Sequence, residues 1–167
     1  MTEIVGFTRC SESMDDHKHT EWINGYFNDM AEIVIAAGGT LDKFMGDAVM
    51  VFFGDLKSEG LEKDALKCIE MAKDMIEKAK AHDIEIRVGI HTGMCTISNF
   101  GSEDRIDYTI LGREVNLASR LESNGEPGRV LTSENTMQVV GERISCSSQK
   151  NIEMKGIDRN SETYLVD

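Results

Sequence analysis

The sequence has little proline, no close pair of cysteines and no long apolar run. Its 167 residues include one proline and four scattered cysteines, none in a C-x-x-C pair. No apolar run approaches the roughly 18 residues that span a bilayer, and the N-terminus lacks a signal-peptide pattern. We therefore expect a cytoplasmic chain with free thiols, although a parent protein could be membrane-anchored elsewhere.

Basic residues are scarce beside acidic ones. The chain has 18 Lys and Arg against 30 Asp and Glu, which gives a net charge of −12. Nucleic-acid binding needs a basic surface, so no nucleic-acid partner is expected. A few well-placed Lys and Arg still suffice for a small anion. The length fits a single domain over residues 1–167, and 40% hydrophobic content is ordinary for a globular protein.

The sequence does contain alternating strand and helix patterns. Apolar residues recur at helical spacing over 22–34 and 61–76, and two shorter helices are predicted over 113–123 and after Ser133, which is a suitable cap. The predicted strands cover residues 2–8, 39–44, 48–53, 84–93, 94–100, 129–133, 151–156 and 162–167. This order predicts an α+β fold with helices on one face of the sheet.

Two carboxylates are placed where strands end or turn. Glu3 lies at the end of the first strand, and Asp47 lies in the turn of a predicted hairpin, "KFMGDAVMVFF". Neighbouring strands could bring the two groups together, and close carboxylates repel unless a proton or a cation lies between them. Hard divalent cations prefer such oxygen ligands. The alternative is that Asp47 is only a turn residue, since Gly-Asp is common in hairpins.

Other residues are suited to phosphate or sugar. Gly6 lets the backbone approach a ligand, so that the amides of Phe7 and Thr8 could point at phosphate oxygens as a helix begins; a simple strand-to-helix turn is the alternative. Arg87 lies inside an apolar strand and needs a partner, for which a structural ion pair is the alternative.

The segment "DYTILGREVNLASRLES" is the most informative of these. Asn116 and Arg120 are four residues apart and share one helix face. Arginine suits phosphate oxygens, and the asparagine amide can orient a sugar hydroxyl; an exposed polar helix face is the alternative. Lys155 in "MKG" precedes a glycine that lets the chain approach a ligand, although a lone lysine is usually solvated.

Together these segments resemble the catalytic domain of class III nucleotidyl cyclases, the adenylyl and guanylyl cyclases. The motifs "EIVGFT", "KFMGDAVMVFFG", "RVGIHTG", "YTILGREVNLASRLE" and "MKG" occur in the family's order and spacing. The resemblance, which is greatest to bacterial-type homodimeric adenylyl cyclases, implies a ferredoxin-like βαββαβ core. It also implies a head-to-tail homodimer with active sites built from both chains, and a regulatory sensor domain on the parent chain.

The resemblance further implies roles for individual positions. Two ions of Mg²⁺ or Mn²⁺ would lie between the carboxylates, bound by Glu3, Asp47 and the Ile4 carbonyl. The triphosphate would be held by Phe7, Thr8, Arg87 and Lys155. Asn116 would orient the ribose, and Arg120 would stabilise charge on the α-phosphate. The reaction implied is adenylate cyclase chemistry, in which the 3′-hydroxyl of ATP attacks its own α-phosphate to give cyclic AMP and pyrophosphate.

Lys43 and Thr109 are the positions that read the base in the family. Adenine presents an acceptor at N1 and a donor at N6, whereas guanine reverses both. Lysine can only donate and a threonine hydroxyl can accept, so this pair favours ATP over GTP.

Two features depart from the family pattern. Glu3 stands where the family usually has aspartate, which alters the ligand geometry that Mg²⁺ prefers. Mn²⁺, which accepts similar ligands, is the expected substitute. The chain also begins two residues before that position, so the first strand looks truncated. The alternatives are a catalytically degraded nucleotide-binding or dimerisation module, and a guanylate cyclase. A diguanylate cyclase is disfavoured because its "GGDEF" signature is missing.

Overall fold

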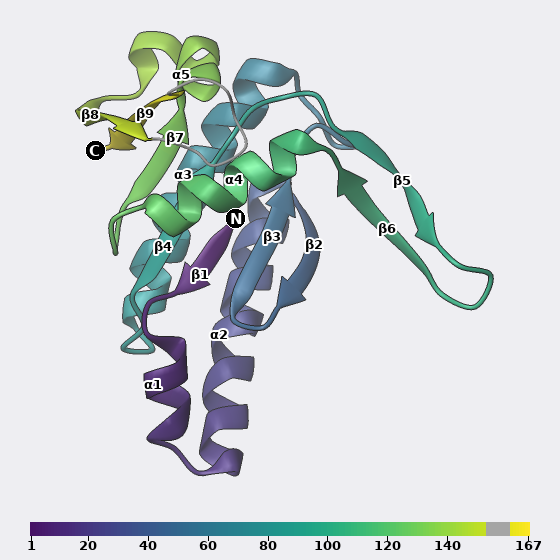
Figure 1. Ribbon diagram of the computed structural model, residues 1–167, viewed down its shortest axis with the longest axis vertical. Helices are drawn as coiled ribbons and strands as arrows, with labels where there is room; N and C mark the ends of the chain where they lie inside the picture. The colour runs from purple at the N-terminus through teal and green to yellow at the C-terminus, as the bar shows by residue number, and fades with distance from the viewer. Residues whose placement is uncertain (153–160) are drawn as a thin grey trace.

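The computed structural model describes residues 1–152 and 161–167, which form a sheet with helices packed on both faces (Figure 1). The strands are β1 (Thr2–Ile4), β2 (Thr40–Met45), β3 (Ala48–Phe52), β4 (Ile86–Ile90), β5 (Thr96–Gly101), β6 (Ile106–Leu111), β7 (Val130–Ser133), β8 (Cys146–Ile152) and β9 (Ser161–Val166). The helices are α1 (Phe7–Glu12), α2 (Asp16–Ala37), α3 (Leu61–Lys80), α4 (Arg113–Asn124), α5 (Glu134–Val140) and a 3-10 turn, Gly141–Arg143.

The strand order confirms the predicted ferredoxin-like core. Seven strands form one sheet in the order β2-β3-β1-β4-β7-β9-β8. Its first four strands alternate with α2 and α3 along the chain, as a βαββαβ unit requires, and every neighbouring pair in the sheet is antiparallel except β4 and β7. The predicted α+β class is therefore correct.

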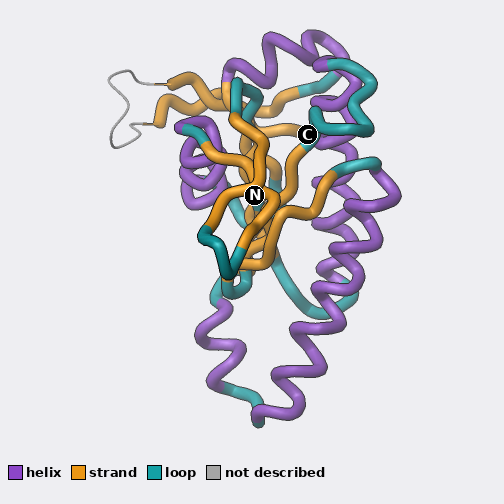
Figure 2. Tube along the Cα trace, turned by 90° about the vertical axis from the view of Figure 1, so that its right-hand side faces the viewer, coloured by secondary structure: helices purple, strands orange, loops and turns teal. Residues whose placement is uncertain are grey.

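The main core lies between this sheet and the two long helices. Figure 2 shows α2 and α3 running along one side of the sheet. Side chains that are buried there alternate along the strands, as period-two burial demands. From β4 they are Ile86, Val88 and Ile90, and they meet Met30 of α2 and Met75 of α3 in one apolar cluster. Because alternate residues point to opposite faces, Arg87 and Gly89 of β4 lie on the face away from this core.

Helix α4 lies on the opposite face, which corrects the expectation that all helices share one face. Figures 1 and 2 place it across β4 and away from α2 and α3. Gly89 explains how it packs so closely, because a Cβ atom at this position would lie 2.4 Å from the Ala118 carbonyl oxygen. Leu121 of α4 packs there on Leu131 and Leu165.

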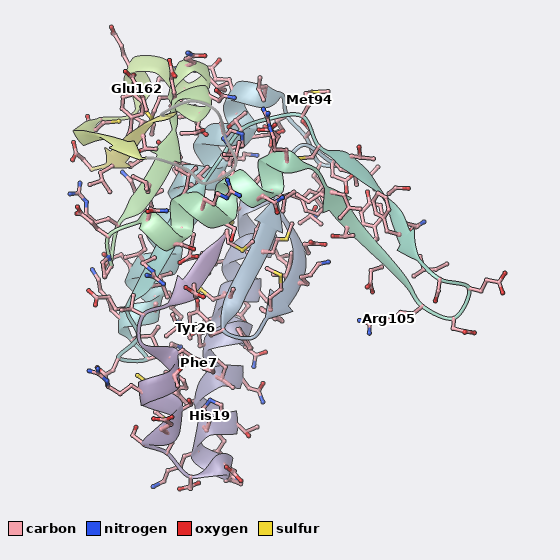
Figure 3. All side chains as sticks on the ribbon, viewed as in Figure 1. Phe7, His19, Tyr26, Met94, Arg105 and Glu162 are labelled. Atoms are coloured by element: carbon pink, nitrogen blue, oxygen red, sulfur yellow. The ribbon has the colours of Figure 1, made fainter. Side chains whose placement is uncertain are left out.

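Strands β5 and β6 form a separate two-stranded sheet that projects from the body of the molecule (Figure 1). Arg105 marks its far end in Figure 3. The sequence prediction included β5 but missed β6, whose residues were assigned only to a motif. The turn-forming segment "GSEDR" between the two strands was the available signal.

Other predictions are confirmed or lie outside the described part. A helix does begin at Phe7, the hairpin turns at Gly46-Asp47, and the Ser133 hydroxyl caps α5 by accepting the Thr136 N–H. All four cysteines are free. The expected strand 151–156 begins earlier, at Cys146, and its residues from 153, including Lys155, lie outside the described residues. No described helix is long and apolar enough to cross a membrane.

Candidate active site

Glu3 and Arg87 are direct cross-strand partners on β1 and β4. Cross-strand partners share a face, so both point away from the main core. The Arg87 guanidinium donates to Glu3 Oε2 at 2.5 Å. The ion pair that the sequence left open for Arg87 is thus present, and it lies at the predicted metal ligand.

Asp47 reaches the same place from the β2–β3 turn. Its Oδ2 accepts the backbone N–H of Ile4 at 3.1 Å. Burial raises the pKa of Asp47, and the negative charge of Glu3 acts in the same direction. The structure therefore brings Glu3, Ile4 and Asp47 together, although they come from segments 43 residues apart.

Glu122 is a third carboxylate in this cluster, and it was not predicted. It lies on α4, its side chain is 4% exposed, and its Oε1 is 3.2 Å from Arg87 Nε. Burial raises the pKa of Glu122 to about 7, the charge of Glu3 adds to this, and Arg87 opposes it. One arginine is thus shared by two carboxylates. The only sequence signal was the unpaired position of Arg87 itself.

The chemistry of this cluster suits a divalent cation. Repulsion between close carboxylates is relieved by a cation, and Mg²⁺ completes its shell with waters or phosphates rather than with protein ligands alone. Among residues 1–152 and 161–167, no three His, Cys, Asp or Glu side chains are grouped to hold a metal. Glu3, Asp47 and the Ile4 carbonyl fit a site that needs substrate or water oxygens to be complete.

Lys43 and Thr109, which were predicted to read the base, are also brought together, through a residue that was not predicted. Thr109 on β6 is buried, and its hydroxyl donates to Asp42 Oδ2 at 2.8 Å. Lys43 Nζ lies 3.7 Å from the same oxygen, and the Lys43 side chain is 38% exposed. Lys43 and Thr109 therefore flank one buried carboxylate.

Phe7 and Thr8 open α1 as expected. Gly6 precedes them with φ of 69°, a left-handed conformation that glycine adopts without strain, and it provides no side-chain cap. The Phe7 ring stacks on Trp22 at 6.3 Å and lies beside His19 at 5.6 Å. Figure 3 labels Phe7 and His19 on the two helices that this contact joins. Thr8 is exposed.

Asn116 and Arg120 lie on α4 as predicted, one exposed and the other half-buried. Within the described residues, neither side chain makes a hydrogen bond or an ion pair. They differ in this from Glu122 on the same helix, which is buried against Arg87.

This sheet order, with carboxylates on β1 and the β2–β3 turn and polar residues on α4, is the arrangement expected of a nucleotidyl cyclase catalytic domain. The family model described as the adenylate and guanylate cyclase catalytic domain matches residues 1–167. The chain therefore belongs to this family. Its members are generally metal-dependent.

The named relatives include both kinds of cyclase. An adenylate cyclase of Anabaena cylindrica is 30% identical over 98% of this chain, which spans 35% of that relative's length. The crystal structure of the adenylyl cyclase CyaB from P. aeruginosa has a TM-score of 0.95 and 43% identity, covering 99% of this chain and 90% of that one. The guanylyl cyclase Cya2 follows with a TM-score of 0.93 and 30% identity, covering 99% and 88%.

Proposed function

We propose that this domain is an adenylate cyclase, which converts ATP to 3′,5′-cyclic AMP and pyrophosphate. Membership of the cyclase family supports the reaction class. The observation that carries the choice of ATP is the meeting of Lys43 and Thr109 at one carboxylate, from positions far apart in the chain. Their donor and acceptor groups match the N1 and N6 positions of adenine.

In the proposed reaction the 3′-oxygen forms a bond to the α-phosphorus, and the bond from that phosphorus to the bridging oxygen breaks. Pyrophosphate leaves, and the hydroxyl proton passes to solvent. Glu3, Asp47 and the Ile4 carbonyl would hold two divalent cations, Mg²⁺ or Mn²⁺. When bound, these ions lower the pKa of the 3′-hydroxyl and neutralise charge on the leaving group.

The chain's own cations and amides bind the triphosphate. We assign this role to the guanidinium of Arg87, the backbone amides of Phe7 and Thr8, and Lys155. Arg87 already lies between Glu3 and Glu122, so it can turn toward phosphate while Glu122 still pairs with it. On α4, Asn116 would orient the ribose and Arg120 would stabilise charge that grows on the α-phosphate.

We propose a homodimer as the active unit, because α4 presents its polar residues away from its own carboxylate cluster. Successive helical residues turn by about 100°, so Arg120 is rotated by roughly 200° and Asn116 by roughly 240° from Glu122. Glu122 faces Arg87 of the same chain. Asn116 and Arg120 therefore suit a nucleotide held at Glu3 and Asp47 of a second copy, and a head-to-tail dimer contains two such sites.

The longer relatives support one more proposal. Since this chain spans 35% of the Anabaena protein, we propose that the parent polypeptide also carries a regulatory sensor domain.

Two alternatives have specific support. Guanylate cyclase activity is supported by relatives such as guanylate cyclase 2D of Rattus norvegicus, 31% identical over 99% of this chain. A nucleotide-binding module without catalysis is supported by Glu3 itself, whose carboxylate is occupied by Arg87.

The test is cyclic nucleotide formation by the purified chain with Mn²⁺, at several protein concentrations, with ATP and with GTP. We expect cyclic AMP, with turnover per chain rising with concentration as dimers form. Cyclic GMP as the main product would establish the guanylate cyclase. ATP binding without product would establish the binding module.

A further inference from the structure

Asp42 owes its position to a β-bulge. Along the β2–β3 ladder Leu41 pairs with Val51 and Lys43 pairs with Met50, so Asp42 is an extra residue without a partner on β3. In a regular strand Asp42 and Lys43 would point to opposite faces. A bulge redirects a side chain, and bulges are frequent beside active sites. Here Asp42 Oδ2 comes within 3.7 Å of Lys43 Nζ.

The Asp42 carboxylate is costly to keep where it lies. Its side chain is 0% exposed, while its Oδ1 atom has no hydrogen-bond partner among the described residues. A buried carboxylate oxygen without a partner is destabilising. The stability of this chain therefore does not explain Asp42, whereas its second oxygen contacts both members of the base-reading pair.

The hydrogen bond from Thr109 to Asp42 fixes the direction of the threonine hydroxyl. A hydroxyl has one hydrogen and two lone pairs. The Thr109 hydroxyl donates to Asp42 Oδ2 at 2.8 Å, so its single hydrogen is already used. What remains for a ligand is a lone pair. Thr109 without such an acceptor could equally donate, and would then fit the O6 atom of guanine.

We propose that Asp42 is a positioning residue that sets base specificity by making Thr109 an obligate acceptor beside the obligate donor Lys43. The pair then accepts a 6-amino purine and rejects a 6-oxo purine. This inference rests on the proposed function, since it assigns the residue that determines which nucleotide that site selects.

The direct test compares ATP with inosine triphosphate, in which a 6-oxo group replaces the 6-amino group. For the wild type we expect kcat/KM to favour ATP by about tenfold to hundredfold, because the O6 acceptor faces the Thr109 lone pair. Asp42→Ala should reduce this ratio by about tenfold and raise the relative use of GTP, because the freed Thr109 hydroxyl can donate to O6. Asp42→Asn retains an acceptor oxygen and should keep most of the preference. Each ratio is measured on one preparation, so a loss of folded protein cancels.

A double-mutant cycle tests whether Asp42 acts through Thr109. Thr109→Val should also reduce the preference, and Asp42→Ala should have no further effect on the ratio in that background. If Asp42 had a purely structural role, Asp42→Ala would lower kcat/KM equally for both substrates and leave the ratio unchanged. An unchanged ratio in Asp42→Ala, or effects that multiply in the double variant, would overturn the proposal.

Asp55→Ala is the matched control, since Asp55 accepts the hydroxyl of Tyr108, the neighbour of Thr109 on β6, at 2.8 Å. It should leave the ratio unchanged. If the wild type forms no cyclic nucleotide, the proposed function fails, and the same ratio is then read from the dissociation constants of the two nucleotides. If it forms cyclic AMP but Asp42→Ala retains the full preference, only the role of Asp42 fails.

Discussion

The side chains around β1 form ion pairs and hydrogen bonds with one another, whereas those of Asn116 and Arg120 on α4 form none in the part of the chain that is described. Arg87 is shared by Glu3 and Glu122, and Asp47 is bound to the Ile4 amide. The carboxylate cluster is therefore organised without a ligand. On α4, in contrast, Asn116 and Arg120 have no side-chain partner among the described residues. This difference is what we expect if the proposed dimer is the active unit, since Asn116 and Arg120 would then meet the nucleotide bound to another copy.

The largest expected effect comes from breaking the organised region. Asp47→Asn keeps an oxygen to accept the Ile4 N–H, so the fold should persist, but it removes the charge that binds a divalent cation. We expect kcat with Mn²⁺ to fall by about 10³-fold or more, since such ions supply several kcal/mol of transition-state stabilisation.

The control for Asp47→Asn is Asp83→Asn. Asp83 lies in a turn with φ of 55°, which asparagine also tolerates. Asp83→Asn should therefore leave activity unchanged. Near-normal activity of Asp47→Asn would contradict a metal role for this residue.

A substitution at Arg120 on α4 should have a smaller effect, on kcat and not on the free energy of unfolding. Arg120→Ala should lower kcat by about 10²- to 10³-fold, the usual effect of removing one donor to transition-state charge. Stability should barely change, because Arg120 has no side-chain partner within residues 1–152 and 161–167. Arg113→Ala, at an exposed arginine of the same helix, is the control. A comparable rise in KM with kcat unchanged would assign Arg120 to ground-state binding instead.

Lys43 is intermediate between the paired side chains around β1 and the unpaired ones on α4, since it is half-exposed beside one buried carboxylate. Lys43→Glu should reduce the preference for ATP over GTP by about tenfold to hundredfold, because a carboxylate accepts where lysine donated. The ratio of cyclic AMP to cyclic GMP formed from mixed nucleotides measures this. An unchanged ratio would remove Lys43 from base recognition.

The smallest effect concerns stability away from the site. The hydrogen bond with His82, at 2.6 Å, holds the pKa of Asp29 below its ordinary value of 3.8. A lowered pKa contributes stability that is present above pH 3.8 and is lost as pH falls through the lower, folded value. Asp29→Asn should therefore cost about 1 kcal/mol near neutral pH, roughly 2–4 °C in Tm.

The difference in Tm between wild type and Asp29→Asn should narrow below about pH 4, as measured by thermal unfolding across pH. Turnover at a temperature well below Tm should stay the same, which separates stability from the site chemistry. A difference in Tm that persists at low pH would show that packing, not charge, is responsible.

Much of this arrangement was predictable because it follows from periodicity and turn chemistry. Alternating burial and the Gly46-Asp47 turn placed Glu3 and Asp47 on strands that could meet, and the four-residue spacing placed Asn116 and Arg120 on one face. The class of fold followed from the order of elements. The roles of single residues came from the resemblance to the cyclases.

What sequence could not reveal depends on tertiary contacts. Strand alternation puts Asp42 and Lys43 on opposite faces, and only the bulge between Leu41 and Lys43 reverses this. From its sequence pattern Glu122 would be an exposed acidic residue on a helix. It is buried because Gly89 lets α4 approach β4. Both residues have carboxyl groups that are buried by neighbours distant in the chain, and no local pattern encodes such burial.

The most direct test of a cyclase site divided between two copies is to mix the two inactive variants, Asp47→Asn and Arg120→Ala, and to measure cyclic AMP formation from ATP. Randomly exchanged dimers should recover about one quarter of wild-type activity, because half of them are mixed and each mixed dimer keeps one intact site. A mixture as inactive as its components, at concentrations where mixed dimers are shown to form, would contradict the account.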